Sequence, residues 1–432
     1  MSSFYTNVQS YNGKILYRGV SNGKKAKLRL NYEPSLFVQS DSHSTFKTLD
    51  GLPLRKTVYE SISKAREYVK QFKDVAGAAK IYGNQNYEYA FIADKYMNPV
   101  EFDISKITVA AIDIETIANE GMPSPQIAKQ AITAITIRYF GGNTYTFGCN
   151  EYKVQGQEIY IQCRDEKDLC ERFLKLWVDR YPDVISGWYS DVFDMPYIIN
   201  RLKIVLGEEE AKTISPWGLL WEQEKLVKDQ LKKTYKIVGI AQLDYKELYY
   251  SFAPNGKTQE NLKLETIANV ELDEGKLSYE EYDSLHRFYL ENYQRFIEYN
   301  IRDVDLIFKL EDKLKLLELA ITLAYTTKSN FEDVFSQTRM WDSMIYSYLL
   351  NRGIIVPPSE VKEKLDRFEG AFVKEVLVGM HKWLASFDLD SLYPHIIMQY
   401  FISPENLVEK SFIQERKQKL ISELKLRKTL NK

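Results

Sequence analysis

Apolar and polar positions alternate along much of the first hundred residues. The stretch KAKLRLNYEPSLFV (25–38) alternates with a period of two, which predicts strand structure, and Pro34 predicts a bend within it. The stretch VYESISKAREYVKQF (58–72) instead repeats apolar residues every three or four positions, which predicts a helix. The segment before about residue 104 is therefore expected to mix strands and helices.

From about residue 106 the pattern changes to longer apolar runs. Runs rich in β-branched residues predict strands over 107–115, 131–140 and 143–148, and a glycine pair between the last two favours a hairpin. Helical periodicity, bounded by capping residues, glycine and proline, predicts helices over 165–182 and 193–207, with a short strand between them. Three strands followed by helix, strand and helix indicate an α/β domain with a mixed sheet.

The rest of the chain has less uniform patterns. The charged stretch 217–235 fits either a helix or a mobile hairpin, and 236–250 fits a strand that passes into a helix. Residues 285–325 have a strongly helical pattern. The stretch RGIIVPPSE (352–360) is expected to be a linker, because two consecutive prolines stop regular structure. Two strand-like runs follow it, at 370–376 and 383–401.

Composition narrows the class of protein. A chain of 432 residues is long enough for about two to four domains. It contains no apolar run of about 18 residues, so no membrane span is expected. Three cysteines and four histidines exclude a dense disulfide framework and a Cys/His zinc cluster, which favours a reducing, cytosolic setting. The formal net charge of −2 argues against a uniformly cationic nucleic-acid binder.

Two acids end the first apolar strand of the α/β segment, ITVAAIDIET (107–116). Asp113 and Glu115 are two residues apart, so in a strand they project from the same face. Adjacent carboxylates repel each other unless a cation neutralises them, and oxygen ligands of this kind suit Mg²⁺ or Mn²⁺. The pair is a candidate metal site, although a solvated strand end gives the same pattern.

Further acids occur where elements change or at helical spacing. Asp194 lies where the short strand passes into a helix, beside the bulky Trp188 and Phe193. It is a candidate ligand or a helix N-cap. Tyr299 and Asp303 are four residues apart and share one helix face. They are candidate site residues or part of a polar stripe on an amphipathic helix.

Together these residues resemble the three exonuclease motifs of DnaQ-like 3′→5′ exonucleases, D-x-E, F-D and Y-x-x-x-D, with the order and spacing of the family B DNA polymerases. The resemblance implies an RNase H-like (DnaQ-like) domain in which Asp113, Glu115, Asp194 and Asp303 hold two Mg²⁺ or Mn²⁺ ions. It implies that Tyr299 orients the attacking water. Such a site would hydrolyse the terminal nucleotide of a single-stranded 3′ end.

The string SFDLDSLYPHII (386–397) resembles motif A of the same polymerase family. By that resemblance Asp388 is a catalytic metal ligand of a nucleotidyl-transfer site. The nucleotide would meet the backbone from Leu389 to Leu392, the Ser391 hydroxyl and the ring of Tyr393. An aspartate that caps a strand before a helix is the structural alternative for the first part of the string.

The segments YEPSLFV, GAFVKE and ISPENL extend the resemblance to the polymerases of T4-type phages over essentially the whole chain. The resemblance implies an α/β multi-domain chain with a mixed α+β N-terminal domain, the exonuclease domain and the beginning of a palm. The expected bounds are 1–104 for the N-terminal domain, rejoined by about 316–358, 105–315 for the exonuclease domain, 359–410 for a partial palm and 411–432 for the start of a fingers helix.

Two residues depart from the family pattern. Tyr189 stands where the family usually has Asn, and His395 where it commonly has Ser. The first change is expected to alter how the substrate strand is held, a task for which Trp188 and Phe193 are candidate DNA contacts. The charged stretch 217–235 would be a strand-separating hairpin by the same resemblance.

The family's K-x-x-x-N-S-x-Y-G and Y-G-D-T-D motifs are absent from these 432 residues. Because one aspartate cannot hold a two-metal site, DNA synthesis is expected only with a second polypeptide that supplies them. The implied partners are single-stranded 3′ ends, primer–template DNA and that polypeptide, with a sliding clamp bound through it and no membrane. The implied location is the cytoplasm of a phage host. A free-standing exonuclease and a non-catalytic DNA-binding remnant are the alternatives.

Overall fold

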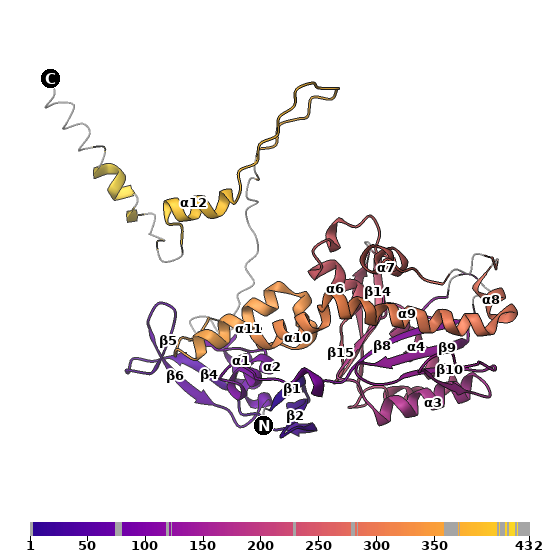
Figure 1. Ribbon diagram of the computed structural model, residues 1–432. Helices are drawn as coiled ribbons and strands as arrows, with labels where there is room; N and C mark the ends of the chain where they lie inside the picture. Colours follow the sequence, from indigo (N-terminus) through magenta and orange to yellow (C-terminus); the bar gives the residue numbers. More distant parts are fainter. Residues whose placement is uncertain are drawn as a thin grey trace. The chain divides into compact units, whose positions relative to one another are not determined.

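A computed structural model gives the arrangement of the chain (Figure 1). The residues that it describes are 3–73, 80–117, 121, 123–227, 230–277, 281–282, 284–357, 370, 372–403, 406, 411–412, 414–419 and 421. The chain divides into two compact units, Met1–Glu360 (unit 1) and Val361–Lys432 (unit 2).

Two small antiparallel sheets form the first part of unit 1, with the orders β1-β2-β3 and β5-β6-β4-β7. Helices α1 (Ile62–Lys73) and α2 (Tyr87–Lys95) accompany them. The strands are β1 Phe4–Tyr11, β2 Lys14–Ser21, β3 Lys24–Leu30, β4 Ser35–Gln39, β5 Phe46–Lys47, β6 Pro53–Val58 and β7 Ile81–Tyr82. The predicted mixture of strands and helices before residue 104 is therefore confirmed.

The bend predicted at Pro34 separates β3 from β4, as the alternating pattern suggested. The predicted helix begins at Ile62 rather than at Val58. Val58 belongs instead to β6, where it pairs with Ser35 of β4. The first apolar position of the apparent helical spacing was therefore recruited by strand pairing, and the next three residues connect β6 to α1.

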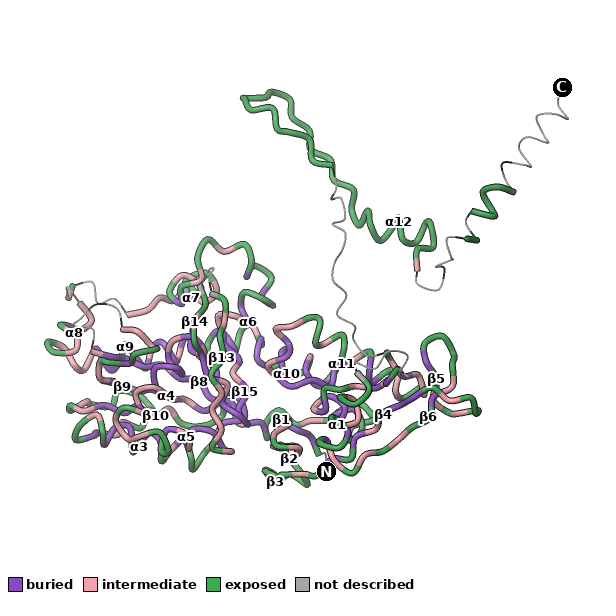
Figure 2. Tube along the Cα trace, turned by 180° about the vertical axis from the view of Figure 1, so that it is seen from behind, coloured by how far each residue is buried: buried purple, intermediate pink, exposed green. Residues whose placement is uncertain are grey.

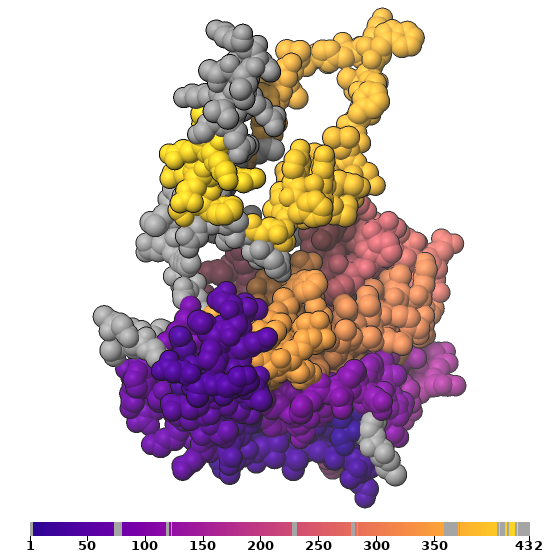
Figure 3. Space-filling model, turned by 90° about the vertical axis from the view of Figure 1, so that its left-hand side faces the viewer, coloured from indigo at the N-terminus to yellow at the C-terminus, as the bar shows by residue number. Residues whose placement is uncertain are grey.

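The segment that follows α9 (Tyr293–Leu314) returns to the first strand. It contains α10 (Leu316–Thr327), the 3₁₀ helix η3 (Phe331–Phe335) and α11 (Gln337–Leu350). The hydroxyl of Tyr5 donates to the carbonyl of Ser329 at 2.7 Å, and the hydroxyl of Tyr325 donates to the carbonyl of Tyr5 at 2.6 Å. In Figure 3 the orange surface of this segment adjoins the indigo and purple N-terminal surface.

A six-stranded mixed sheet forms the second part of unit 1, in the order β11-β10-β9-β8-β12-β15. The β8–β9 and β9–β10 pairs are antiparallel, whereas β8–β12, β12–β15 and β10–β11 are parallel. The strands are β8 Val109–Thr116, β9 Ile132–Tyr139, β10 Thr144–Gly148, β11 Ile159–Gln162, β12 Val184–Ser186 and β15 Ala241–Gln242. The three predicted strands, the short strand and the mixed sheet are confirmed.

Helices cover both faces of this sheet (Figure 1). Apolar residues of α3 (Glu166–Asp179) and α4 (Asp194–Val205) share a core with Ile112 and Ile114, which point to one face. Helix α9 packs across β8 and β9 on the other face. Figure 2 shows the resulting buried centre. The remaining short helices of unit 1 are η1 Ile104–Lys106, α5 Glu208–Lys212, α6 Tyr245–Phe252, η2 Gly256–Thr258, α7 Leu264–Leu272 and α8 Leu285–Glu291.

The charged stretch 217–235 is a hairpin and not a helix. Strand β13 (Leu220–Val227) pairs antiparallel with β14 (Gln230–Ile237) as a separate two-stranded sheet. Lys225 of β13 forms ion pairs with Asp191, at 2.6 Å, and with Glu247. These pairs tie the hairpin to the segment before α4 and to α6.

Unit 2 contains helix α12 (Leu392–Tyr400), which begins inside the predicted strand-like run 383–401. The described residues of 370–376 and 383–391 form no strand, so both strand predictions are wrong for these residues. Most of the expected start of a fingers helix, 411–432, lies outside the described residues. Among all helices of the described part, none combines the length and the apolar composition needed to cross a bilayer.

Candidate active site

Strand β8 carries the first two candidate ligands toward α9. Asp113 and Glu115 alternate with Ile112 and Ile114, which are buried in the core on the opposite face. Glu115 is 7% exposed, whereas Asp113 is half-buried. The expected common direction of the two carboxylates therefore follows from the period of the strand.

Asp194 is the first residue of α4 and is buried. One of its carboxylate oxygens accepts a hydrogen bond from the backbone N–H of Ile114 at 3.1 Å. Asp194 is not the N-cap, a position that Phe193 occupies. Its side chain thus joins the start of α4 to β8, between the two acids of that strand.

Helix α9 supplies the remaining candidates. Tyr299 and Asp303 lie one turn apart on the buried side of α9. Carboxylate oxygens of Asp113, Glu115 and Asp303 all lie within 4.8 Å of one another. The structure therefore brings together acids separated by almost two hundred positions in the chain. Together with Asp194 they are called the carboxylate cluster.

Burial, together with the charges of neighbouring carboxylates, raises the pKa values of these groups. Burial, followed by the charges of Asp194 and Asp303, raises the pKa of Asp113 well above its usual range. Burial and the charge of Asp303 raise the pKa of Glu115 to about 8. Burial raises the pKa of Asp194 to about 7, and it also raises the pKa of Asp303. The cluster therefore binds protons readily when no other cation neutralises it.

One lysine lies within the cluster. Lys276, in the segment between α7 and α8, forms an ion pair with Asp303 and approaches the Tyr299 hydroxyl at 3.5 Å. Burial alone would lower its pKa, but the charges of Asp303 and Asp113 raise it above the ordinary value. A single ammonium group offsets only part of the charge of four carboxylates.

The donor set fits hard divalent cations. All four groups offer carboxylate oxygens, the ligands that Mg²⁺ and Mn²⁺ prefer. The second oxygen of Asp303 is buried and has no hydrogen-bond partner among the described residues. An unsatisfied buried carboxylate oxygen is costly unless a ligand meets it. The carboxylate cluster can therefore accommodate the divalent ions expected from the sequence.

A buried hydrogen-bond chain orients Asp113. The amide nitrogen of Asn300 donates to the Asp113 carboxylate at 2.6 Å. The amide oxygen of Asn300 accepts from the Thr136 hydroxyl at 2.5 Å, and this hydroxyl lies 3.0 Å from that of Thr146. Helix α9 and strands β9 and β10 thus support one carboxylate of β8.

The aromatic candidates before α4 lie in partly buried packing. The indole N–H of Trp188 donates to the carbonyl of Leu262 at 3.0 Å. Phe193 packs against Tyr197 with ring centroids 5.8 Å apart. Tyr189 adopts a left-handed backbone conformation with φ of 70°. Lys246 lies 4.1 Å from the centroid of its ring.

The motif A residues lie in unit 2, in and before α12. Ser391 has a left-handed conformation (φ 53°) and precedes the helix directly. The side chains of Asp388, Leu389, Leu392 and Tyr393 are exposed. Among the described residues, Asp388 does not belong to a group of acids whose carboxylate oxygens lie close enough together to hold a metal ion.

Comparison with known proteins matches two segments to models of one family. Residues 69–267 match the exonuclease domain of DNA polymerase family B, and residues 331–430 match DNA polymerase family B. The chain belongs to the family B DNA polymerases. The first match contains Asp113, Glu115 and Asp194, and the second contains Asp388.

Similar family B polymerases come from phages and cells. The DNA-directed DNA polymerase of Escherichia phage RB69 is 30% identical over 439 residues, which cover 94% of this chain and 48% of that protein. The DNA-directed DNA polymerase of Enterobacteria phage T4 has the same identity and coverage. The DNA polymerase delta catalytic subunit of Plasmodium falciparum is 25% identical over 355 residues, 74% of this chain and 31% of the relative. The chain thus spans about half the length of its phage relatives.

Two residues in this family B chain were missed by sequence reasoning. Lys276 lies outside any helix or strand, so no periodic pattern marks it. Asn300 directly follows Tyr299 and reads as one more polar residue of an amphipathic helix. What distinguishes Asn300 is that its amide is buried on the face of α9 that meets the sheet. Only the structure reveals this feature.

Proposed function

We propose that the chain carries a two-metal 3′→5′ exonuclease that removes the terminal nucleotide from single-stranded 3′ ends. The observation that supports this proposal is the convergence of Asp113, Glu115, Asp194 and Asp303 in one buried cluster. The exonuclease domain would be RNase H-like and span about 105–315, between an N-terminal domain of residues 1–104 and its return at about 316–358.

Different side chains of the chain would bind the metal ions, orient a carboxylate and orient the attacking water. Asp113, Glu115 and Asp303, with Asp194, would hold two divalent ions, and Asn300 keeps the Asp113 carboxylate oriented. When bound, such ions lower the pKa of the attacking water and stabilise the leaving oxygen. The Tyr299 hydroxyl would orient that water. Carboxylates that must ionise to bind metal make the site sensitive to pH.

A frayed 3′ end suits this site better than a paired one, because unpairing a terminal nucleotide costs a few kcal/mol. Trp188 and Phe193 lie close in sequence to Asp194 and would contact the strand. Stacking on aromatic side chains tolerates any base, as an exonuclease requires. The β13–β14 hairpin would help to separate the strands.

For DNA synthesis, we propose that Asp388 binds metal and that Leu389, Ser391, Leu392 and Tyr393 contact the nucleotide. Residues 359–410 would form part of a palm, and 411–432 would start a fingers helix. The remaining polymerase motifs would come from a second polypeptide, through which a sliding clamp would act. A location in the cytoplasm of a phage host stays a prediction.

The exonuclease proposal is tested with the whole chain, a 5′-labelled single-stranded oligonucleotide and Mg²⁺ or Mn²⁺. We expect stepwise shortening from the 3′ end, abolished by chelation and by the double variant Asp113→Ala, Glu115→Ala. Asp342→Ala, which removes an exposed acid on α11, is the matched control and should remain active. If the double variant degrades the oligonucleotide as fast as the wild-type chain, these two acids are not part of the nuclease site.

The synthesis proposal has a separate test. Primer–template, deoxynucleotides and Mg²⁺ are supplied with and without a polypeptide that carries the two absent motifs. We expect extension only when both chains are present and Asp388 is intact. Extension that persists with Asp388→Ala would contradict the assignment of motif A, and degradation without any extension in the mixture would favour a free-standing exonuclease.

A further inference from the structure

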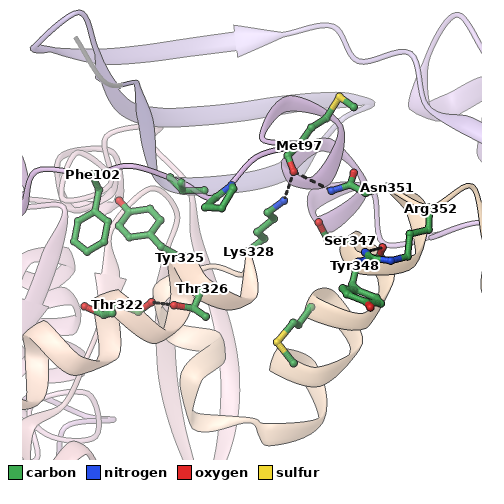
Figure 4. Close-up of a pocket in the computed structure, with 13 residues that line it drawn as sticks. Met97, Phe102, Thr322, Tyr325, Thr326, Lys328, Ser347, Tyr348, Asn351 and Arg352 are labelled. Carbon is green, nitrogen blue, oxygen red and sulfur yellow. Dashed lines mark hydrogen bonds between the residues drawn. The ribbon is translucent and has the colours of Figure 1, made fainter.

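Unit 1 contains a cavity whose lining includes no residue of the carboxylate cluster. The cavity measures about 370 Å³ and lies between the segment after α2, the end of α10 and helix α11 (Figure 4). Its size falls within the range typical of sites for small organic ligands. None of the lining residues is acidic, whereas Lys328 and Arg352 are basic. The cavity is therefore suited to an anion.

Lys328 is a buried cation in the wall of this cavity. It is the C-cap of α10, and only 9% of the residue is exposed. Its ammonium group donates to the carbonyl of Met97 at 3.0 Å and forms no ion pair with a described residue. Burial lowers its pKa. A buried ammonium group with a neutral acceptor is poorly compensated, so an anionic ligand would stabilise it.

The end of α11 brings a second cation to the same wall. The side chain of Asn351 donates to the carbonyl of Met97 at 2.9 Å, so residue 351 and Lys328 meet at one acceptor (Figure 4). The neighbouring Arg352 stacks on Tyr348, with the guanidinium carbon 3.5 Å from the ring centroid. One of its N–H groups donates to the Tyr348 carbonyl. The planar fork of the guanidinium group suits phosphate oxygens.

Apart from the hydroxyl residues Thr322, Thr326 and Ser347, the rest of the lining is apolar or aromatic. Phe102 and Tyr325 form a tilted pair with ring centroids 4.4 Å apart. Met97 and Tyr348 lie toward solvent, 63% and 56% exposed. Thioether and aromatic groups adapt to a flat ring and stack on it. Two basic groups beside such a surface match a ligand that joins a phosphate to an aromatic base.

We propose that this cavity binds a mononucleotide. The phosphate would meet Lys328 and Arg352, and the base would lie against Tyr348 and Met97. This site goes beyond the proposed exonuclease and does not depend on it, because its residues are distinct from those that would hold the metal ions.

The test uses the whole chain with Asp113→Ala and Glu115→Ala, in EDTA, so that the carboxylate cluster cannot bind a nucleotide through metal. Deoxyadenosine monophosphate (dAMP) is titrated calorimetrically, with one site per chain expected. Lys328→Met should weaken binding at least about tenfold, the value of a hydrogen bond to a charged group. The fold should survive, because Asn351 still satisfies the Met97 carbonyl.

Lys64→Met is the matched control, since Lys64 is an exposed lysine on α1 that pairs with Glu67. It should bind dAMP like the parent chain. Lack of dAMP binding at millimolar concentration, or equal affinities in the Lys328 and Lys64 variants, would overturn the proposal.

Three further ligands test the chemistry of the site. Deoxyadenosine and inorganic phosphate should each bind more weakly than dAMP, and equal binding of either would overturn the assignment of a nucleotide. A 5′-phosphorylated tetranucleotide presents the same phosphate on a strand end. Tighter binding of this strand end than of dAMP would overturn the choice of a free mononucleotide.

Discussion

Metal binding to the carboxylate cluster should release protons. The cluster holds Asp113, Glu115, Asp194 and Asp303 in buried surroundings that raise all four pKa values. Carboxylates bind divalent ions only when ionised. Adding Mn²⁺ to the metal-free chain should therefore expel the protons that burial and mutual repulsion have retained.

The number of protons follows from the pKa values of Glu115 and Asp194. At pH 7, Glu115 with a pKa of about 8 is roughly nine-tenths protonated, and Asp194 with a pKa of about 7 is roughly half protonated. Full ionisation of these two groups releases about 1.4 protons, and Asp113 adds to this value. By linkage, the apparent affinity should then rise at least about 25-fold per pH unit near pH 7.

The pH window of the effect differs from that of an ordinary surface carboxylate, which is already ionised at pH 6 and has no proton to release there. Because the pKa values are raised in the folded chain, the retained protons decrease as the pH rises from 6 toward 9. Proton release on binding should therefore be greatest at the acid end of this range, whereas Mn²⁺ affinity should be greatest at the basic end.

Isothermal titration calorimetry in two buffers with different heats of ionisation measures the released protons directly. The double variant Asp113→Ala, Glu115→Ala should lose both the binding and the release, and Asp342→Ala, which removes an exposed acid of α11 and leaves the cluster intact, should change neither. Mn²⁺ binding at pH 7 with no proton release would refute the electrostatic reasoning. Undiminished release by the double variant would place the bound ion elsewhere.

Three substitutions test how the site is supported. Asn300→Leu removes the amide that holds Asp113 and should weaken Mn²⁺ affinity by about 10–100-fold in the same titration, with circular dichroism unchanged. Gly187→Ala places a Cβ 2.8 Å from the carbonyl of Ile112, so it should displace the turn before α4 and also weaken Mn²⁺ binding. Gly370→Ala is the control and should leave Mn²⁺ binding unchanged, because its Cβ meets no atom within 4 Å. Lys225→Met breaks the ion pairs that hold the hairpin and should speed amide hydrogen exchange in β13 and β14, whereas Lys232→Met, the register partner across the hairpin, should have little effect.

Local periodicity was enough to predict the shared direction of Asp113 and Glu115 and of Tyr299 and Asp303. Each pair depends only on the repeat of one strand or one helix. Local periodicity could not predict which helix face meets which strand. The expectation that the two pairs converge therefore came from the family resemblance. Lys276 escaped prediction because its place in the cluster depends on tertiary contacts alone.

The hairpin 217–235 was ambiguous because its sequence is charged on both strands. Leu226 and Leu231 are paired across the hairpin and are both exposed, so no buried face imposes the usual alternation. The opposite error occurred at 383–391, where apolar residues suggested a strand. Apolar content alone does not make a strand without a partner to complete the hydrogen-bond ladder, and the described residues of unit 2 provide none.

Tyr189 links a departure in sequence to the geometry of the site. Tyr189 has a left-handed conformation, which is unfavourable for a bulky residue and is tolerated best by Gly, Asn and Asp. Asn is the residue that the family resemblance leads us to expect here. The backbone nevertheless holds this conformation, because the carbonyl of Tyr189 accepts the N–H groups of Val192 and Phe193. These bonds form the turn that leads into Asp194. The turn therefore fixes the backbone, and the change from Asn to Tyr adds an aromatic ring, stacked with Lys246, just ahead of a cluster carboxylate.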